Sequence, residues 1–314
     1  MSVRPFVHAT ALGRNGGAEA LGAYAPLCSA TAFALVAVLA SGTPVLAVVC
    51  YFAYWVGGVV VPGVLIHRRL LGLSESLLAD VAWGAVTGLL LELVSWSTLT
   101  ALQINAFLWA PPVGVILLFA STRRLRSMWR RPTGAARTPL FLNWGVACAA
   151  VLGTTSVWLG SFTQNHLPPT GDPYYVDLPT ILMRTWILPS MFVAIAATAC
   201  LAVHVTRRPL AGAMAALITV ATTSGIAFWP SVSLSVNVLD PNSPSLLYSV
   251  GFSCLLVRLL IEVVRDSPMT VTRGSLLMCV ALASAGAKSS ILPDVLGGLA
   301  LFLGFERAPA PETT

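Results

Sequence analysis

The chain has 314 residues, of which 56% are hydrophobic and only 10% are charged, and its mean hydropathy is +0.82. Soluble domains contain about 25% charged residues, so this composition excludes an ordinary soluble domain and indicates a protein with several membrane spans. The net charge of +6 does not indicate nucleic-acid binding, because no basic run is interleaved with aromatic residues on which bases could stack.

The apolar runs predict the fold class. They are continuous rather than alternating, and in lipid only helices or closed barrels satisfy every backbone polar group. We therefore expect an all-α fold, a polytopic transmembrane helix bundle of about ten spans. Residues 27–66 contain no charged side chain, and the sequence SGTP at 41–44 divides them into a helical hairpin. The predicted spans are 24–41, 45–66, 81–101, 107–121, 140–160, 189–206, 209–229, 245–264, 274–287 and 290–305.

The arginines predict the orientation. With ten spans, almost all of them fall in loops on one side, including six between residues 121 and 137, whereas the other side receives only Arg184 and Lys288. Positive residues favour the cytoplasmic side, so we expect a multi-pass cell-membrane protein with both termini in the cytoplasm. The expected organisation is a cytoplasmic segment 1–26, a transmembrane domain 27–305 with outer loops near 161–189 and 230–244, and a disordered cytoplasmic tail 306–314.

Two smaller patterns concern packing. Gly84 and Gly88 are four residues apart in the third predicted span, a spacing that lets two helices approach closely. The six cysteines are scattered singly through apolar segments, so neither a disulfide framework nor a zinc site is expected.

The predicted topology collects polar residues on the outer side, and most of these residues also have a structural interpretation. Asp177 could cap the helix that follows it, and Asp172 and Asp240 stand in turn sequences. The others could be interfacial or solvated. The full set consists of His166, Asp172, Tyr174, Tyr175, Asp177, Arg184, Asp240 and Lys288.

Lys288 and Glu92 are harder to explain structurally. Lys288 lies among small residues where two short apolar segments meet, and Glu92 lies within a predicted span. A charge near the bilayer centre costs on the order of 3 kcal/mol. Lys288 therefore needs a carboxylate, helix-end carbonyls or a bound anion, unless it extends to the outer headgroups. Glu92 is expected to face the bundle interior in a polar contact.

Five stretches resemble a known family of membrane enzymes. The stretches VVVPGVLIHRRLLG (59–72), DVAWGAVTGLLLEL (80–93), GDPYYVDLPT (171–180), DPNSPSLLYS (240–249) and GAKSSILPDVLGGLAL (286–301) resemble actinobacterial multi-pass proteins of the GT-C glycosyltransferase superfamily, of the family-39 type. The resemblance implies an enzyme that takes a sugar from a polyprenyl-phosphate carrier at the outer face. In such proteins the acidic loop usually follows the first span and the chain is longer, so the resemblance also fits a truncated or degenerate relative.

The resemblance assigns roles to the outer residues. Asp172 best matches the family's acidic position and Asp177 is the second match, so both are candidate catalytic residues. Lys288 matches the lysine of a G-A-K-x-S-x-L-P run, and with Arg184 it would offset charge on the departing lipid phosphate. His166, Tyr174, Tyr175 and Asp240 complete the candidate substrate-binding set. No metal site is predicted, although Asp172 and Asp177 have the oxygen ligands that a divalent metal prefers, and the cofactor is left open.

Two functions of different classes remain open. The first is a glycosyltransferase whose partners are membrane lipids and a polyprenyl-phosphate-linked sugar. The alternative is a non-catalytic scaffold, accessory subunit or lipid or solute carrier. The enzyme requires Asp172 and Lys288 to face one cavity, whereas a scaffold does not.

Overall fold

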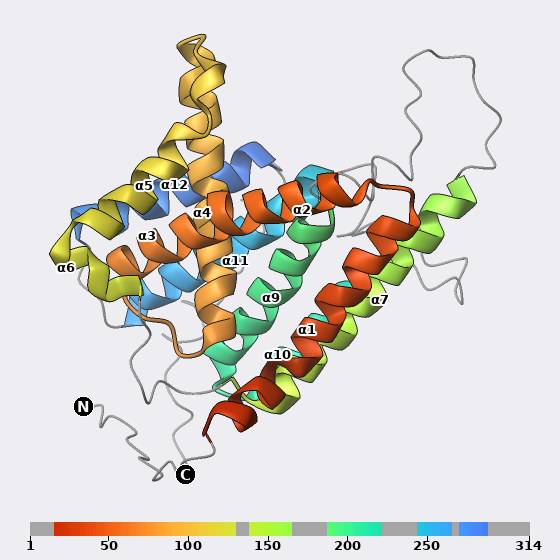
Figure 1. Ribbon diagram of the computed structural model, residues 1–314. Helices are drawn as coiled ribbons and strands as arrows, with labels where there is room; N and C mark the ends of the chain where they lie inside the picture. The colour runs from red at the N-terminus through yellow and green to blue at the C-terminus, as the bar shows by residue number, and fades with distance from the viewer. Residues whose placement is uncertain (1–15, 130–137, 165–186, 222–243, 266–269, 288–314) are drawn as a thin grey trace, which may run out of the picture.

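The computed structural model describes residues 16–129, 138–164, 187–221, 244–265 and 270–287. Within these ranges the ordered elements are helices and there is no strand, which confirms the all-α class (Figure 1). The longer helices are α1 (Gly16–Ala40), α2 (Val45–Tyr54), α3 (Val61–Leu71), α4 (Leu77–Ala101), α5 (Ala110–Ser121), α7 (Leu140–Gln164), α9 (Ile187–Thr206), α10 (Pro209–Ala221), α11 (Pro244–Arg265) and α12 (Val271–Ala287).

The predicted break at residues 41–44 is present between α1 and α2. Gly42 has a φ of +82°, a conformation that favours glycine, and Pro44 directly precedes α2. Beyond this turn, α2 continues through a short π-helical segment, η1 (Trp55–Val60), into α3, so that Val45–Leu71 is one apolar helix of 27 residues. The sequence WVGGVV of η1 contains two glycines, and its π-helical turn is wider than a turn of α-helix.

Five helices are long and apolar enough to cross a membrane. They are Gly22–Ala40, Val45–Leu71, Leu77–Ala101, Leu140–Val157 and Leu188–Thr206. A sixth is possible if Asn105–Ser121 and Arg123–Trp129, which bend by 96° at Thr122, form one span. In the described ranges α10 and α12 are shorter apolar helices, and the predicted span 290–305 lies outside those ranges. The ten-span count therefore stays a prediction.

The glycine pair on α4 forms the close helix contact that its spacing predicts. A Cβ on Gly88 would lie 2.8 Å from the carbonyl carbon of Val59 in η1, and a Cβ on Gly84 would lie 2.8 Å from Cα of Val64 in α3. Gly63 of α3 faces the same pair, with its Cβ position 2.8 Å from Cα of Gly88. The backbones of η1, α3 and α4 are thus in direct contact, which leaves no room for side chains.

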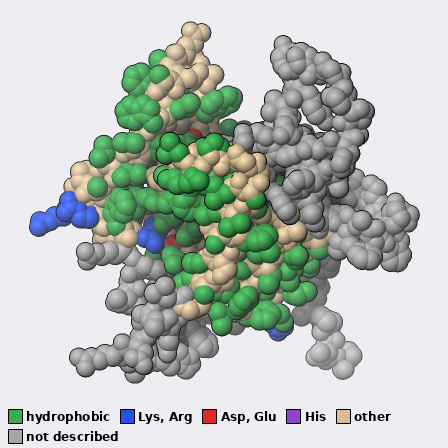
Figure 2. Space-filling model, turned by 45° about the vertical axis from the view of Figure 1, so that its right-hand side comes forward, with side chains coloured by type: hydrophobic (Ala, Val, Ile, Leu, Met, Phe, Trp, Pro, Cys, Tyr) green, Lys and Arg blue, Asp and Glu red, His purple; other side chains and the backbone are tan. Residues whose placement is uncertain are grey.

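Of the remaining long helices, α9, α11 and α12 pack directly on α4, and α7 and α10 join the bundle through α9. On one side α1 runs along α7, and α10 lies against both α7 and α9 (Figure 1). On the other side α11 packs on α9 and α12, and α11 and α12 each contact α4. The visible surface of the described residues is mostly hydrophobic, with few charged side chains (Figure 2). Large apolar residues such as Leu46, Leu117 and Leu282 are 74%, 61% and 66% exposed, a surface suited to lipid rather than water.

Segments predicted to lie in cytoplasmic loops meet at one end of the bundle. The backbone N–H of Leu78, at the start of α4, donates to Oγ1 of Thr138, just before α7. At this same end, the Arg68 side chain reaches the carbonyl of Met128, and the Arg207 side chain reaches Glu75. The ends of α3 and α9, the segment Arg123–Trp129 that follows α5, and the starts of α4 and α7 therefore share one polar end.

Candidate functional site

The sequence-predicted site residues lie outside the part of the chain that the structure describes. This applies to His166, Asp172, Tyr174, Tyr175, Asp177, Arg184, Asp240 and Lys288. Whether Asp172 and Lys288 face one cavity therefore stays a prediction. The described helices instead reveal two cavities and a buried polar cluster, which we define by their residues below.

The first cavity is an apolar groove of about 670 Å³, here called the apolar groove. Its walls come from α1, α2, η1, α4, α7 and α9, and Leu35, Tyr51, Trp55, Ala85 and Phe192 are among its lining residues. None of the described residues that line it is charged. A volume of this size is typical of a small-molecule site, and its apolar walls suit a hydrocarbon chain.

The second cavity, here called the Glu92 cavity, measures about 660 Å³. It lies between the end of α2, α4, the residues just before α5, α11 and α12. Tyr54, Trp96, Tyr248 and Phe252 contribute four aromatic rings to its walls. Glu92 is the charged residue among the described lining residues. Its Oε1 atom is buried and has no hydrogen-bond partner among the described residues.

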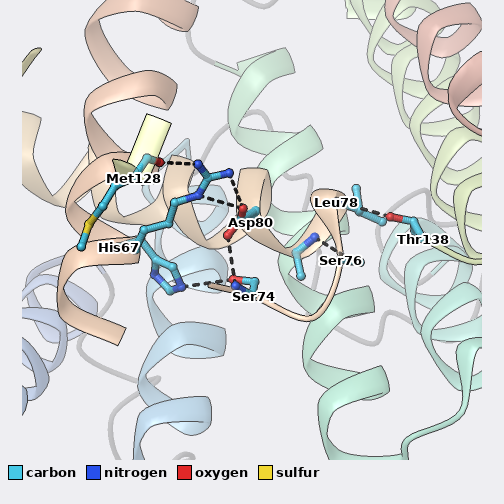
Figure 3. Close-up of polar contacts among 9 residues, drawn as sticks. His67, Ser74, Ser76, Leu78, Asp80, Met128 and Thr138 are labelled. Carbon is cyan, nitrogen blue, oxygen red and sulfur yellow. Dashed lines mark hydrogen bonds and ion pairs between the residues drawn. The ribbon is translucent and has the colours of Figure 1, made fainter. Parts of the chain in front are cut away.

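A buried polar cluster joins α3 to the first turn of α4 at the polar end of the bundle (Figure 3). Ser76 caps α4 by accepting a hydrogen bond from the Ala79 N–H at 3.1 Å, and this cap places Asp80 in the first turn. Asp80 is fully buried and accepts from Nε and Nη2 of Arg68 at 2.9 and 2.6 Å. Its other oxygen accepts from the Ser74 N–H at 3.2 Å. The carboxylate thus closes the α3–α4 turn.

His67 and Arg258 extend this cluster to α11. Arg258 donates to Glu262 at 2.9 Å and lies 5.0 Å above the ring of Trp83. Its Nη1 lies 3.5 Å from Nε2 of His67, which is also 3.3 Å from the Ser74 hydroxyl. Because a guanidinium only donates, the contact requires Nε2 to accept, which places the imidazole proton on Nδ1. That Nδ1 is buried without a hydrogen-bond partner among the described residues.

A smaller polar contact lies at the surface of the same end. Glu75, in the α3–α4 turn, forms ion pairs with Arg207 and, at 3.6 Å, with His204 of α9. The hydrogen bond from His204 is the main cause that lowers the pKa of the Glu75 carboxyl, and Arg207 adds to it, while partial burial opposes the shift. This contact links the turn to the end of α9.

The chemistry of these sites differs. Arg68 of α3 pairs with Asp80 of α4, and Arg258 of α11 contacts Trp83 of α4 and His67 of α3. This cluster therefore holds α3, α4 and α11 together rather than presenting groups to a ligand. Among the described ranges no group of three or more His, Cys, Asp or Glu side chains could hold a metal ion. Within the part of the chain that the structure describes, the two cavities offer space in which a ligand could bind.

Sequence reasoning singled out Glu92 but missed its aromatic neighbours and the Arg68–Asp80 pair. Glu92 and Tyr54 are 38 positions apart in the sequence, and no local pattern joins them. Asp80 had a local signal, since it follows a serine cap and opens an apolar helix. The i,i+4 spacing of Arg258 and Glu262 was a second available signal.

Comparison with known proteins adds no relative: the chain matches no protein-family model, no curated protein and no solved structure. The function must therefore be argued from the fold and the cavities.

Proposed function

We propose that this protein is a multi-pass integral membrane protein of the cell membrane that binds a lipid chain in its apolar groove. The apolar groove carries this proposal. A groove of about 670 Å³ with no charged residue in its described lining suits a hydrocarbon chain, and the helices that form it are long and apolar enough to cross a bilayer. A polyprenyl chain is the occupant that agrees with the sequence resemblance.

Mass spectrometry of lipids that co-purify with the protein tests this directly. We expect a polyprenyl phosphate or a polyprenyl-phosphate sugar to be enriched over its share of the membrane extract. Recovery of bulk phospholipids alone, in the proportions of the extract, would contradict the polyprenyl assignment.

The proposed orientation places the polar end of the bundle in the cytoplasm. Supporting this, Arg68 contacts the carbonyl of Met128, beside Arg123–Arg126, and Arg207 lies at the same end. Clustered arginines favour the cytoplasmic side. A reporter fused at Tyr174 is expected to be active outside the cytoplasm, and one fused after Arg126 inside it; the reverse pattern would overturn the orientation.

The finer proposal is sugar transfer at the outer face. Asp172 would take the proton of an acceptor hydroxyl as its oxygen bonds to the anomeric carbon, while the bond from that carbon to the lipid phosphate breaks. Arg184 and Lys288 would offset the negative charge on the departing phosphate. What supports these roles is the sequence resemblance and the cationic character of the two residues.

Substitution of Asp172 tests the chemistry. Because general-base catalysis is worth about 10²–10⁴-fold, Asp172→Asn is expected to reduce sugar transfer by that factor at unchanged protein level and membrane insertion. Asp240→Asn, a matched change in the other outer loop, should have a smaller effect. Full transfer by Asp172→Asn would remove the assignment.

A non-catalytic lipid or solute carrier is the second candidate. The observation that favours it is Glu92, an ionisable residue within a membrane-length helix that borders a cavity. Such residues commonly mark transport or binding sites. Retained lipid together with no sugar transfer by the wild-type protein would support the carrier over the enzyme.

A further inference from the structure

We propose that the Glu92 cavity binds an amphiphilic organic cation, a molecule with an ammonium group and an apolar tail, that enters from the lipid. This inference concerns a different cavity from the apolar groove and does not depend on sugar transfer. It rests on the carboxylate, the aromatic rings and the position of the opening.

The carboxylate supplies the first argument. Glu92 lies on α4 at residue 16 of 25, far from the polar end of the bundle. Its Oε1 is buried and has no hydrogen-bond partner among the described residues, and Tyr54 is a hydrogen-bonding neighbour of the carboxyl group. An ionised carboxylate in apolar surroundings requires a compensating charge. Because the terminal torsion of glutamate is broad and two-fold, either oxygen can turn toward the cavity.

No cationic side chain among the described lining residues supplies that charge. Arg258 also projects from α11, but its guanidinium pairs with Glu262 and stacks over Trp83, next to His67. The described lining therefore contains one carboxyl group and no positive side chain. The Glu92 cavity is therefore best suited to a positively charged ligand.

The aromatic residues define the kind of cation. Tyr54, Trp96 and Tyr248 line the cavity together with Glu92. Aromatic faces attract ammonium groups through the ring quadrupole, and rings of this kind are the usual means of binding alkylated ammonium ions. A small hydrated metal ion would gain little from such walls, since it prefers several oxygen ligands.

The opening of the cavity and its remaining lining residues indicate that the ligand has an apolar tail. Trp96 is 55% exposed and Tyr54 is 40% exposed, on helices whose outer surfaces are apolar. The lining also includes the aliphatic side chains of Leu89, Leu108 and Ala283, and Leu89 and Ala283 are buried. A ligand that partitions into lipid can thus reach the carboxylate laterally, with its tail against the aliphatic wall. A volume of about 660 Å³ accommodates a ligand of this size.

The test uses the full-length protein in a neutral maltoside detergent, with octyltrimethylammonium as probe and octyl sulfate as the anionic match. Tryptophan fluorescence is titrated with each probe in the wild type, in Glu92→Gln and in Glu75→Gln, the same change in an exposed turn. We expect a saturable response to the cation in the wild type and in Glu75→Gln. In Glu92→Gln we expect at least tenfold weaker binding, with an unfolding midpoint no lower than that of the wild type. Octyl sulfate should give no saturable response.

A second variant tests the aromatic contribution. Trp96→Leu keeps apolar contact but loses the ring, and a loss of 0.5–1 kcal/mol corresponds to about two- to fivefold weaker binding, measured by the ligand-dependent shift of the unfolding midpoint. Equal cation binding by the wild type and Glu92→Gln would overturn the proposal, as would equal binding of octyl sulfate. Cation binding seen only after Lys288→Ala would also overturn it, because that result would assign the carboxylate to an ammonium of the chain itself.

Discussion

Arg68 and Asp80 form a buried ion pair in which two guanidinium N–H groups converge on one carboxylate oxygen, at 2.9 and 2.6 Å. The pair connects the last turn of α3 to the first turn of α4, and the third contact of Arg68, to the carbonyl of Met128, holds the segment that follows α5. One side chain thus fixes three segments at the polar end of the bundle. Removal of the Arg68 side chain should therefore destabilise all three segments.

We predict that Asp80→Asn lowers the free energy of unfolding by about 3–5 kcal/mol, because it leaves a buried guanidinium without its counter-charge. Denaturant-induced unfolding of the purified protein in detergent measures this change. Arg68→Met should cost a comparable amount, whereas Arg69→Met, at the exposed neighbouring position, should change stability little. Equal effects of the two arginine substitutions would show that the pair does not hold this end together.

We predict that Gly88→Ala destabilises the protein by about 1–3 kcal/mol, since the added methyl group must displace the backbone of Val59. The matched control is Gly114→Ala on α5, where a Cβ would meet no atom within 4 Å. Alanine favours a helix over glycine by up to about 1 kcal/mol, so the control should be neutral or stabilising. Thermal unfolding midpoints of the two variants provide the comparison, and a stable Gly88→Ala variant would rule out the close contact of η1 with α4.

The contact of Glu75 with His204 and Arg207 predicts a dependence of stability on pH. The folded-state pKa of Glu75 lies below its ordinary value of 4.5. Its contribution to stability is therefore present above that ordinary value and is lost as the pH falls through the lower folded-state pKa. Because the side chain is 54% exposed, the effect should stay below about 1 kcal/mol.

The difference in unfolding midpoint between the wild type and Glu75→Gln, followed from pH 7 to about pH 3, measures this contribution. We expect the wild type to be the more stable protein at neutral pH and the two to converge as the pH falls below the ordinary glutamate range. A difference that stays constant over the whole range would assign the stabilisation to packing rather than to charge.

We predict that Ala47→Trp, which introduces a bulky ring at a residue lining the apolar groove, reduces the amount of co-purified lipid per protein several-fold. Leu46→Trp is the matched control, because Leu46 is the neighbouring residue on α2, is 74% exposed and does not line the groove. Quantitative lipid mass spectrometry compares the two. Equal lipid content in both variants would show that the retained lipid binds elsewhere.

The sequence predicted most of the described helices close to their observed ends. The break at residues 41–44, the starts of α7 and α9 and the close contact made by Gly84 and Gly88 all follow from local patterns. The differences are informative too: α1 begins at Gly16 rather than 24, and α2 continues through η1 and α3 to Leu71. In both cases the helix continues beyond the apolar run, because backbone hydrogen bonding does not stop where hydrophobicity ends.

The sequence by itself determined the all-α class and the positions of the apolar helices, because the length of an apolar run and its breaks are local properties of the chain. Only the tertiary structure decided which polar groups meet. Arg258 and His67 are separated by 191 positions, and Glu92 shares a cavity with Tyr54 and Tyr248 from two other helices. Such contacts depend on how whole helices pack and rotate against one another, which no pattern within one segment specifies.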